Sequence, residues 1–330
     1  MCARAWIIAL GLFLGGRPVM AQAPQAEAGG VPGETSVLKW KDGKKAVFLL
    51  AFDDSCQTHV RKAIPELSRR GLAGTFYINP GKGPFQSERK AWEQELPKNP
   101  CVAYGNHTFT HVGATNAAQL DAELARCGAV IHACYPERKQ PRLVSFGRPG
   151  GVPWTVSDEE KRQALAKHNL IERPPFFSYP FHVKTAEEVC GLVDAALAKG
   201  EMGHLDFHGV GGDWLSTPLE VFTALLDRLD ACREEVWTTD HITYHQYLTE
   251  RSGAAVTRVR ADKAQIRLRL ACTADPALYD QPLTLETRVS PEWQGCRITQ
   301  GAARVERPVR AGIVRYDARP GSDEILLQPL

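Results

Sequence analysis

The segment KKAVFLLAFDD, residues 44–54, decides the fold of this chain. Its seven apolar residues run without a break and end on two adjacent carboxylates, Asp53 and Asp54. An uninterrupted apolar run of this length is typical of a strand that is buried on both faces of a parallel sheet. A helical pattern follows in HVRKAIPELSRR (59–70), and the next apolar run is AGTFYI (73–78). The order strand, helix, strand predicts the repeating unit of an α/β domain.

Five more short apolar runs continue this rhythm toward the C-terminus. They are CVAYG (101–105), RLVSF (142–146), LIE (170–172), MGHLDFH (202–208) and EVWTT (235–239). Three capping-box patterns predict helix starts between them: Ser157 with Glu160, Thr185 with Glu188, and Thr217 with Glu220, the last with Pro218 at the first helical position. We therefore predict an α/β fold, a distorted (β/α) barrel of about seven strands, over residues 37–250.

The two ends of the chain have a different composition. Residues 251–330 alternate apolar and polar positions between Pro and Gly turns, which predicts a small all-β, sandwich-like C-terminal accessory domain. Residues 22–36 are rich in Gly, Ala and Pro and are expected to be a flexible lead-in. Arg4 precedes the apolar run AWIIALGLFL (5–14), and a small-residue exit follows, so residues 1–21 are predicted to be a cleaved signal peptide.

The apolar run is too short for a retained membrane anchor, which needs about 20 apolar residues. We therefore expect a secreted or periplasmic protein with no transmembrane anchor after cleavage. The full chain has 40 basic and 38 acidic residues, and the signal carries off Arg4 and Arg17, so the mature chain is formally neutral. This balance, without a run of Lys or Arg, argues against a nucleic-acid partner.

Eight cysteines remain after Cys2 leaves with the signal, and an even number in an exported protein permits disulfides. Cys272 and Cys296 are predicted to pair, because both fall in the same small domain. The spacing of the cysteines does not match a zinc knuckle.

Polar side chains stand where several predicted strands end, the edge at which parallel α/β barrels hold their sites. They are Asp53 and Asp54 in AFDDS, His107 and His111 in GNHTFTH, Arg148 in FGRPGG, and His208 in LDFHG. Each has a structural alternative, such as a capping aspartate, a loop arginine or a packed histidine. His241 and His245 repeat the i, i+4 spacing in DHITYH without a carboxylate pair beside them, so we predict that they serve packing or lie at the surface.

The ordered set AFDDS, NHTFTH, GRPGG and LDFHG resembles the polysaccharide deacetylases of the NodB-homology class, carbohydrate esterase family four, over roughly residues 40–250. The resemblance implies that Asp54, His107 and His111 hold a divalent metal, with zinc expected, leaving positions open for water and substrate. It also implies that Asp53 is the general base, Arg148 its orienting partner and His208 the general acid. The metal would activate a bound water and polarise the acetyl carbonyl.

The chain departs from the family pattern in three places. Ser55 stands where glycine usually follows the two aspartates, and Gly150 and Gly151 replace an aromatic residue after the third motif. The usual Asp-plus-Trp fourth motif is not found. Asp206 is a candidate for its aspartate, which would support the acid His208, and is also predicted to bind substrate. Trp214 in GGDW is predicted to line a sugar subsite, with Trp154 the weaker choice. A backbone N–H near Gly150 or Gly151 is a candidate for the oxyanion site.

Three functions remain open from these residues. The first is a metal-dependent hydrolase that removes acetyl groups from N-acetylated sugars of a polysaccharide, such as peptidoglycan, a chitin-like chain or an exopolysaccharide. The second uses the same site on O-acetyl esters, as on xylan. The third is a catalytically inactive carbohydrate-binding protein.

Overall fold

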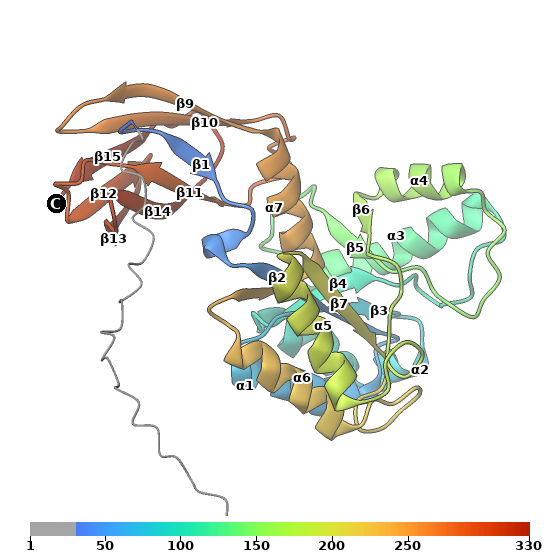
Figure 1. The fold of residues 1–330 in the computed structure, drawn as a ribbon. Coiled ribbons are helices and arrows are strands. Elements are labelled where there is room, and N and C mark those ends of the chain that lie inside the picture. Colours follow the sequence, from blue (N-terminus) through green and yellow to red (C-terminus); the bar gives the residue numbers. More distant parts are fainter. Residues whose placement is uncertain (1–30) are drawn as a thin grey trace, which may run out of the picture.

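The predicted strands form one parallel sheet in the computed structural model, which describes residues 31–330 (Figure 1). Its order is β6-β5-β4-β3-β2-β7, and β8 also pairs with β2. The strands are β2 (Ala46–Asp53), β3 (Gly74–Ile78), β4 (Val102–Asn106), β5 (Val144–Phe146), β6 (Leu170–Glu172), β7 (Met202–Phe207) and β8 (Val236–Thr239). The predicted distorted barrel is confirmed, and its parallel sheet is a half-barrel with β6 and β7 at its edges.

The segment AVFLLAFD forms the centre of this sheet, because every residue of β2 is buried. Phe52 stacks on Phe76 of β3 and on Phe207 of β7, with ring centroids 4.5 and 5.2 Å apart. β3 pairs with the C-terminal part of β2, whereas β8 pairs with its N-terminal part. The apolar run therefore sets both the sheet and the core.

The gap between the edge strands β6 and β7 is crossed by the chain that follows β6. Ser178 makes a parallel bridge with Asp206 of β7, and the backbone N–H of Asp206 donates to the carbonyl of Phe177 at 2.8 Å. Residues 173–178 thus run from one edge strand to the other at the carboxyl ends of the strands. This crossing carries Arg173 toward the centre of the sheet.

Helices cover the outside of the half-barrel. A π-helical turn, His59–Ala63, leads into α1 (Ile64–Arg70), and the other helices are α2 (Gly83–Ser87), α3 (Ala117–Ala133), α4 (Asp158–Lys167), α5 (Ala186–Lys199), α6 (Leu219–Ala231) and α7 (His241–Gly253). The capping boxes at Ser157 and Thr185 are confirmed. The third is wrong: Pro218 is the N-cap of α6, because the backbone of Thr217 is already paired with Gly209 and Gly211.

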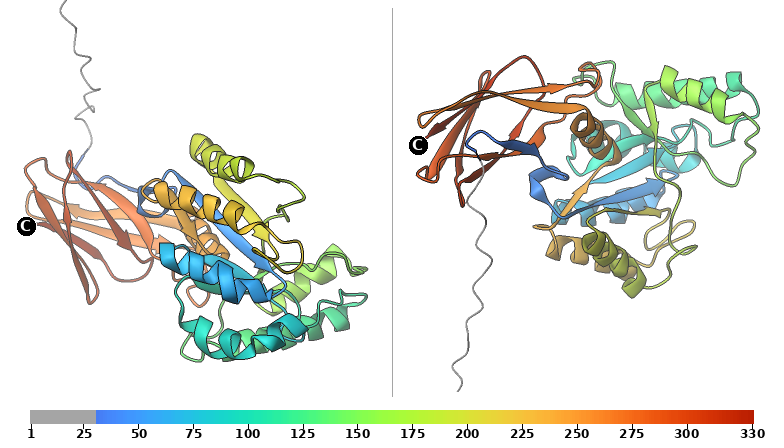
Figure 2. Two further views of the ribbon diagram at one scale, coloured as in Figure 1. Left: turned by 90° about the horizontal axis from the view of Figure 1, so that it is seen from below. Right: turned by 45° about the horizontal axis from the view of Figure 1, so that its top comes forward.

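The C-terminal residues form a β module of two antiparallel sheets. One sheet has the order β13-β12-β15-β10-β9 and the other β1-β11-β14. The strands are β1 (Thr35–Val37), β9 (Ala254–Ala261), β10 (Ile266–Cys272), β11 (Leu283–Arg288), β12 (Gly295–Gln300), β13 (Ala303–Pro308), β14 (Ile313–Ala318) and β15 (Ile325–Pro329). Both views in Figure 2 show this module at one end of the half-barrel, beside α7.

The N-terminal segment corrects the predicted lead-in. Residues 35–37 form β1, which pairs antiparallel with β11, so the lead-in ends before residue 35 and the chain enters the β module first. The strand forms because Thr35 and Val37 are half-buried against the module. The predicted signal peptide, residues 1–21, lies outside the described residues. Within residues 31–330, no helix has the length and apolar character needed to cross a membrane.

The predicted Cys272–Cys296 disulfide is wrong. All eight cysteines of residues 31–330 are free thiols. Cys296 faces Pro329 at the end of β15, whereas Cys272 lies beyond Leu268, which faces Ile325 at the start of β15. The two cysteines therefore occupy opposite ends of the sheet, with a strand between them.

Candidate active site

Three of the predicted site residues meet at the carboxyl ends of β2 and β4. His111 Nε2 lies 3.2 Å from Asp54 Oδ1, and His107 Nε2 lies 3.8 Å from the same oxygen. One ligand atom from each of the three residues lies within 4.8 Å of the others. Two imidazoles and one carboxylate converging in this way match the three-ligand set of a catalytic zinc site.

The hydrogen bonds around this cluster leave its ligand atoms free. His107 Nδ1 donates to the carbonyl of Gly147 at 2.6 Å, so the lone pair of Nε2 faces Asp54. Burial lowers the pKa of His107 to about 4, which keeps the ring neutral. Asp54 Oδ1 is buried and has no hydrogen-bond partner among residues 31–330. A buried carboxylate oxygen without a donor fits a metal cation.

The backbone that presents these ligands is strained. Asp54, Ser55 and His111 have φ angles of 73, 51 and 61°, in the left-handed region that favours glycine. Ser55 therefore takes the conformation expected of the glycine it replaces. Its hydroxyl accepts a hydrogen bond from Asn79 N at 3.0 Å, which ties the turn to the loop after β3.

The arginine beside Asp53 is Arg173 and not Arg148. Nη1 and Nη2 of Arg173 donate to the two carboxylate oxygens of Asp53 at 2.6 and 2.7 Å. Burial opposes ionisation of Asp53, but Arg173 and then His107 hold the pKa of that carboxyl well below its usual range. Arg148 is exposed, and its guanidinium lies over the ring of Trp154, 5.1 Å from the centroid.

The sequence carried a signal for Arg173 that the motif assignment missed. Arg173 directly follows β6 in ERPPFF, and Phe176 supplies the aromatic residue that GRPGG lacks. Arg148 also comes shortly after a strand, β5, and also precedes a proline. The aromatic residue after Arg173 is thus the one sequence difference noted between the two, and the path of residues 173–178 across the half-barrel is what brings Arg173 to Asp53.

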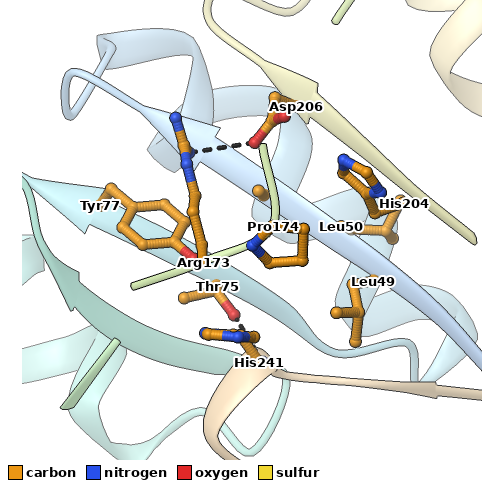
Figure 3. Close-up of a pocket in the computed structure, with 10 residues that line it drawn as sticks. Leu49, Leu50, Thr75, Tyr77, Arg173, Pro174, His204, Asp206 and His241 are labelled. Carbon is orange, nitrogen blue, oxygen red and sulfur yellow. Dashed lines mark hydrogen bonds and ion pairs between the residues drawn. The ribbon is translucent and has the colours of Figure 1, made fainter. Parts of the chain in front are cut away.

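Asp206 lies against Arg173, as Figure 3 shows. Its Oδ1 is 3.0 Å from Arg173 Nη1, and its Oδ2 accepts from Phe177 N at 2.7 Å. The Tyr77 ring packs against the guanidinium at 4.5 Å. Burial, opposed by Arg173 and assisted by Asp53, raises the pKa of Asp206 to about 6. The expectation that Asp206 supports His208 is thus corrected, because the carboxyl is used to hold Arg173.

His208, at the end of β7, lies close to Asp54, His107 and His111, the three candidate metal ligands that we call the metal-ligand cluster. Its Nε2 lies 4.0 Å from Asp54 Oδ2, and its ring is flanked by Phe176 at 5.8 Å and Trp214 at 6.2 Å. His208 Nδ1 has no partner among the described residues. The backbone carbonyl of His208 accepts a hydrogen bond from buried His59 at 2.6 Å. The position of His208 is therefore fixed through its main chain.

These residues line one large groove of about 1080 Å³. Its walls include Asp53, Asp54, Lys82, His107, His111, Arg148, Gly150, Gly151, Arg173, Phe176, Phe181, His208 and Trp214. Trp214 and Phe181 are each 59% exposed, which leaves their rings free to meet a ligand. No atom lies within 4 Å of a Cβ built on Gly150 or Gly151, so the wall there is open.

The remaining predicted residues lie apart from the cluster. Trp154 is partly buried, and its Nε1 donates to the carbonyl of Pro149 at 2.9 Å. His241 is buried at the start of α7 with Nδ1 2.7 Å from Ser145 Oγ, as the packing prediction requires. His245 is half-buried, 3.3 Å from Tyr279 OH.

The family model for polysaccharide deacetylases matches residues 40–170, which include β2, β4 and the whole metal-ligand cluster. Residues 40–170 are therefore similar to polysaccharide deacetylases. This chain is also 32% identical to gellan lyase from a Bacillus species over an aligned length of 304 residues. That match takes in 81% of this chain and 12% of the length of gellan lyase, so this chain spans only a small part of it.

Solved structures that match this chain share low sequence identity with it. A carbohydrate esterase family four pseudoenzyme from Bacillus anthracis matches with a TM-score of 0.44 and 14% identity over 60% of this chain and 64% of its own. Peptidoglycan deacetylase PdaC from Bacillus subtilis matches with a TM-score of 0.44 and 12% identity, and the match covers 61% of this chain and 90% of PdaC. A family four carbohydrate esterase from Streptomyces lividans, in complex with acetate, matches with a TM-score of 0.39 and 16% identity. The match covers 59% of this chain and 92% of the esterase.

Proposed function

We propose that this protein is a metal-dependent hydrolase that removes acetyl groups from N-acetylated sugars of a polysaccharide. The observation that carries the proposal is the joint placement of Asp54, His107 and His111 in an open groove that Asp53 and His208 also line. An acetyl group bound over the cluster would meet both a base and an acid.

Asp54, His107 and His111 would hold the metal, and zinc suits two neutral imidazoles and one carboxylate. A divalent cation there supplies Lewis acidity and lowers the pKa of a water molecule. The chain contributes the geometry: the carbonyl of Gly147 fixes the tautomer of His107, and the strained turn after β2 aims Asp54 into the groove.

Asp53 would accept the proton of the attacking water. Its Oδ2 lies 3.8 Å from His107 Nε2, so it borders the place where the water is held. Arg173 keeps the carboxylate ionised and fixes its plane through two hydrogen bonds. Asp206 and Tyr77 hold Arg173 in turn. Arg148 is better placed to contact the polymer at the rim than to orient the base.

His208, whose Nε2 lies 4.0 Å from Asp54 Oδ2, would donate a proton to the leaving nitrogen. Amide hydrolysis needs this proton because an amine anion is a poor leaving group. Trp214 and Phe181 offer apolar faces for sugar rings, and the open wall at Gly150 and Gly151 leaves room for the chain and for a backbone donor to the oxyanion.

The decisive experiment is a panel assay for acetate release from N- and O-acetylated glycans, with and without a chelator. The zinc-loaded protein should release acetate from an N-acetylated polymer, and chelation should abolish the release. His107→Ala and His111→Ala should lose bound metal in elemental analysis, whereas Asp53→Asn should keep the metal and lose turnover. Full zinc in the double histidine variant, or undiminished turnover in Asp53→Asn, contradicts the assignment.

One observation favours O-acetyl esters as an alternative substrate. His208 Nδ1 has no supporting acceptor among the described residues, so the acid lacks the partner that would stabilise its charged form. Ester cleavage depends less on an acid, because an alkoxide leaves more readily than an amine anion. The inactive alternative predicts glycan binding without acetate release even after zinc is supplied. The intact pair of Asp53 and Arg173 argues against it.

A further inference from the structure

The β module differs in charge from the rest of the chain. Residues 254–330 contain twelve basic and nine acidic residues, an excess of three positive charges in a mature chain that is formally neutral. Eleven of the twelve basic residues are arginines and only Lys263 is a lysine. Arginine binds carboxylate, sulfate and phosphate through two parallel hydrogen bonds, which lysine cannot do.

Most of these arginines are neutralised within the molecule. Eight of the eleven lie within 4.0 Å of a carboxylate, such as Arg315 on Glu286 at 2.6 Å and Arg288 on Glu34 at 3.4 Å. Among residues 31–330, the other three have no such partner. They are Arg258, Arg307 and Arg310.

Two of the three unpaired arginines line the same groove. It measures about 400 Å³, within the usual range of ligand sites, and lies between β13, the turn after it and β14. Arg307 and Arg310 stand beside Arg315, which is held in place by Glu286 and by the carbonyl of Asp42 at 2.8 Å. Three guanidinium groups face one carboxylate, so the groove keeps an excess of about two positive charges.

The groove is separate from the deacetylase site and continues along the module. It shares no lining residue with the active-site groove, and β13 and β14 lie at the opposite end of the molecule from α4 (Figure 1). A second hollow of about 220 Å³ adjoins it and shares Glu286 and Ile313. Glu34, Thr35, Ser36 and Arg288 complete its lining, and Glu34 pairs with Arg288, so the excess of positive charge is confined to the first groove. A chain whose anionic groups bind at Arg307 and Arg310 therefore has room to continue along the outer face of the sheet β1-β11-β14, where its contacts would be polar and not cationic.

The surface of the module excludes two other kinds of partner. Its exposed large apolar residues are Val259 and Leu330, so residues 254–330 offer no exposed aromatic ring for stacking on a neutral sugar. Two unpaired arginines in one groove are also far fewer than the several phosphate contacts of a nucleic-acid site. We propose that the β module binds an anionic polysaccharide, with Arg307 and Arg310 receiving the carboxylate or sulfate groups of the chain.

Binding by the full chain can be measured by calorimetry, without turnover, against polygalacturonate, dextran sulfate, neutral dextran and duplex DNA. We expect binding to an anionic glycan and none to dextran. The double variant Arg307→Gln/Arg310→Gln should weaken it about tenfold or more. Preference between polygalacturonate and dextran sulfate tells which anionic group is recognised. Because turnover is not measured, failure of the proposed deacetylation would not affect this result.

Arg258→Gln is the matched control, because it removes the same charge from an exposed arginine outside the groove. It should leave glycan affinity within about twofold of the wild type, and Arg307→Lys should recover only part of the loss. The proposal is overturned if the control weakens binding as much as the groove variants, if DNA binds as tightly as the glycans, or if no anionic glycan binds.

Discussion

Replacing Arg173 by Gln should destabilise the protein strongly and stop turnover. Arg173 makes bonds of 2.6 and 2.7 Å to Asp53 and lies 3.0 Å from Asp206, and all three side chains are at most 6% exposed. Removing one partner of a buried ion pair leaves uncompensated charge and costs about 3–5 kcal/mol. Here two carboxylates lose the same partner. We therefore expect the free energy of unfolding to fall by at least that amount.

Urea unfolding followed by tryptophan fluorescence measures this change, and Arg148→Gln is the matched control. Arg148 borders the same groove but is exposed, and its guanidinium lies over the Trp154 ring, an interaction worth about 0.5–1 kcal/mol at the surface. If Arg173→Gln does not fold, Arg173→Lys keeps the charge and loses the second hydrogen bond, so it should fold with an intermediate loss. The reasoning fails if Arg173→Gln unfolds within about 1 kcal/mol of the wild type, or if Arg148→Gln is the more damaging change.

Four further outcomes are expected. Burial raises the pKa of Glu250, with a smaller contribution from Asp280, to about 7, so its contribution to stability is full below pH 4.5 and is lost as the pH rises through 7. In urea unfolding, the stability of Glu250→Gln relative to the wild type should therefore rise by about 2–3 kcal/mol from pH 5 to pH 8. Gly113→Ala should lower both stability and zinc affinity, because φ is +84° and the new Cβ would lie 2.2 Å from the Pro153 carbonyl oxygen. Trp214→Ala should raise KM for a polymer while changing the free energy of unfolding by less than about 0.5 kcal/mol, since the ring is 59% exposed. His208→Ala should slow amide cleavage by about 10²-fold or more and ester cleavage by much less, and equal losses on both substrates would remove its role as acid.

The sequence alone predicted the parallel sheet, and the resemblance of its motifs predicted that Asp54, His107 and His111 lie together. The apolar run of β2 could be satisfied only by burial on both faces, and parallel strands bring their carboxyl ends together. Asp54, His107 and His111 come at or just after the ends of such strands, so their meeting required only that the strands lie close in the sheet. The antiparallel β module was likewise predictable from its alternating pattern.

Only the tertiary structure decided which arginine orients Asp53 and where the chain first enters the β module. Arg148 and Arg173 both come after a strand and precede a proline, and the choice depends on the crossing from β6 to β7, a contact between residues far apart in sequence. β1 belongs to the module because its partner β11 lies near the other end of the chain. Local pattern fixes which residues are buried, but pairing between distant segments depends on the packing of the whole chain. The free thiols of Cys272 and Cys296 show the same limit, since strand register placed them at opposite ends of one sheet.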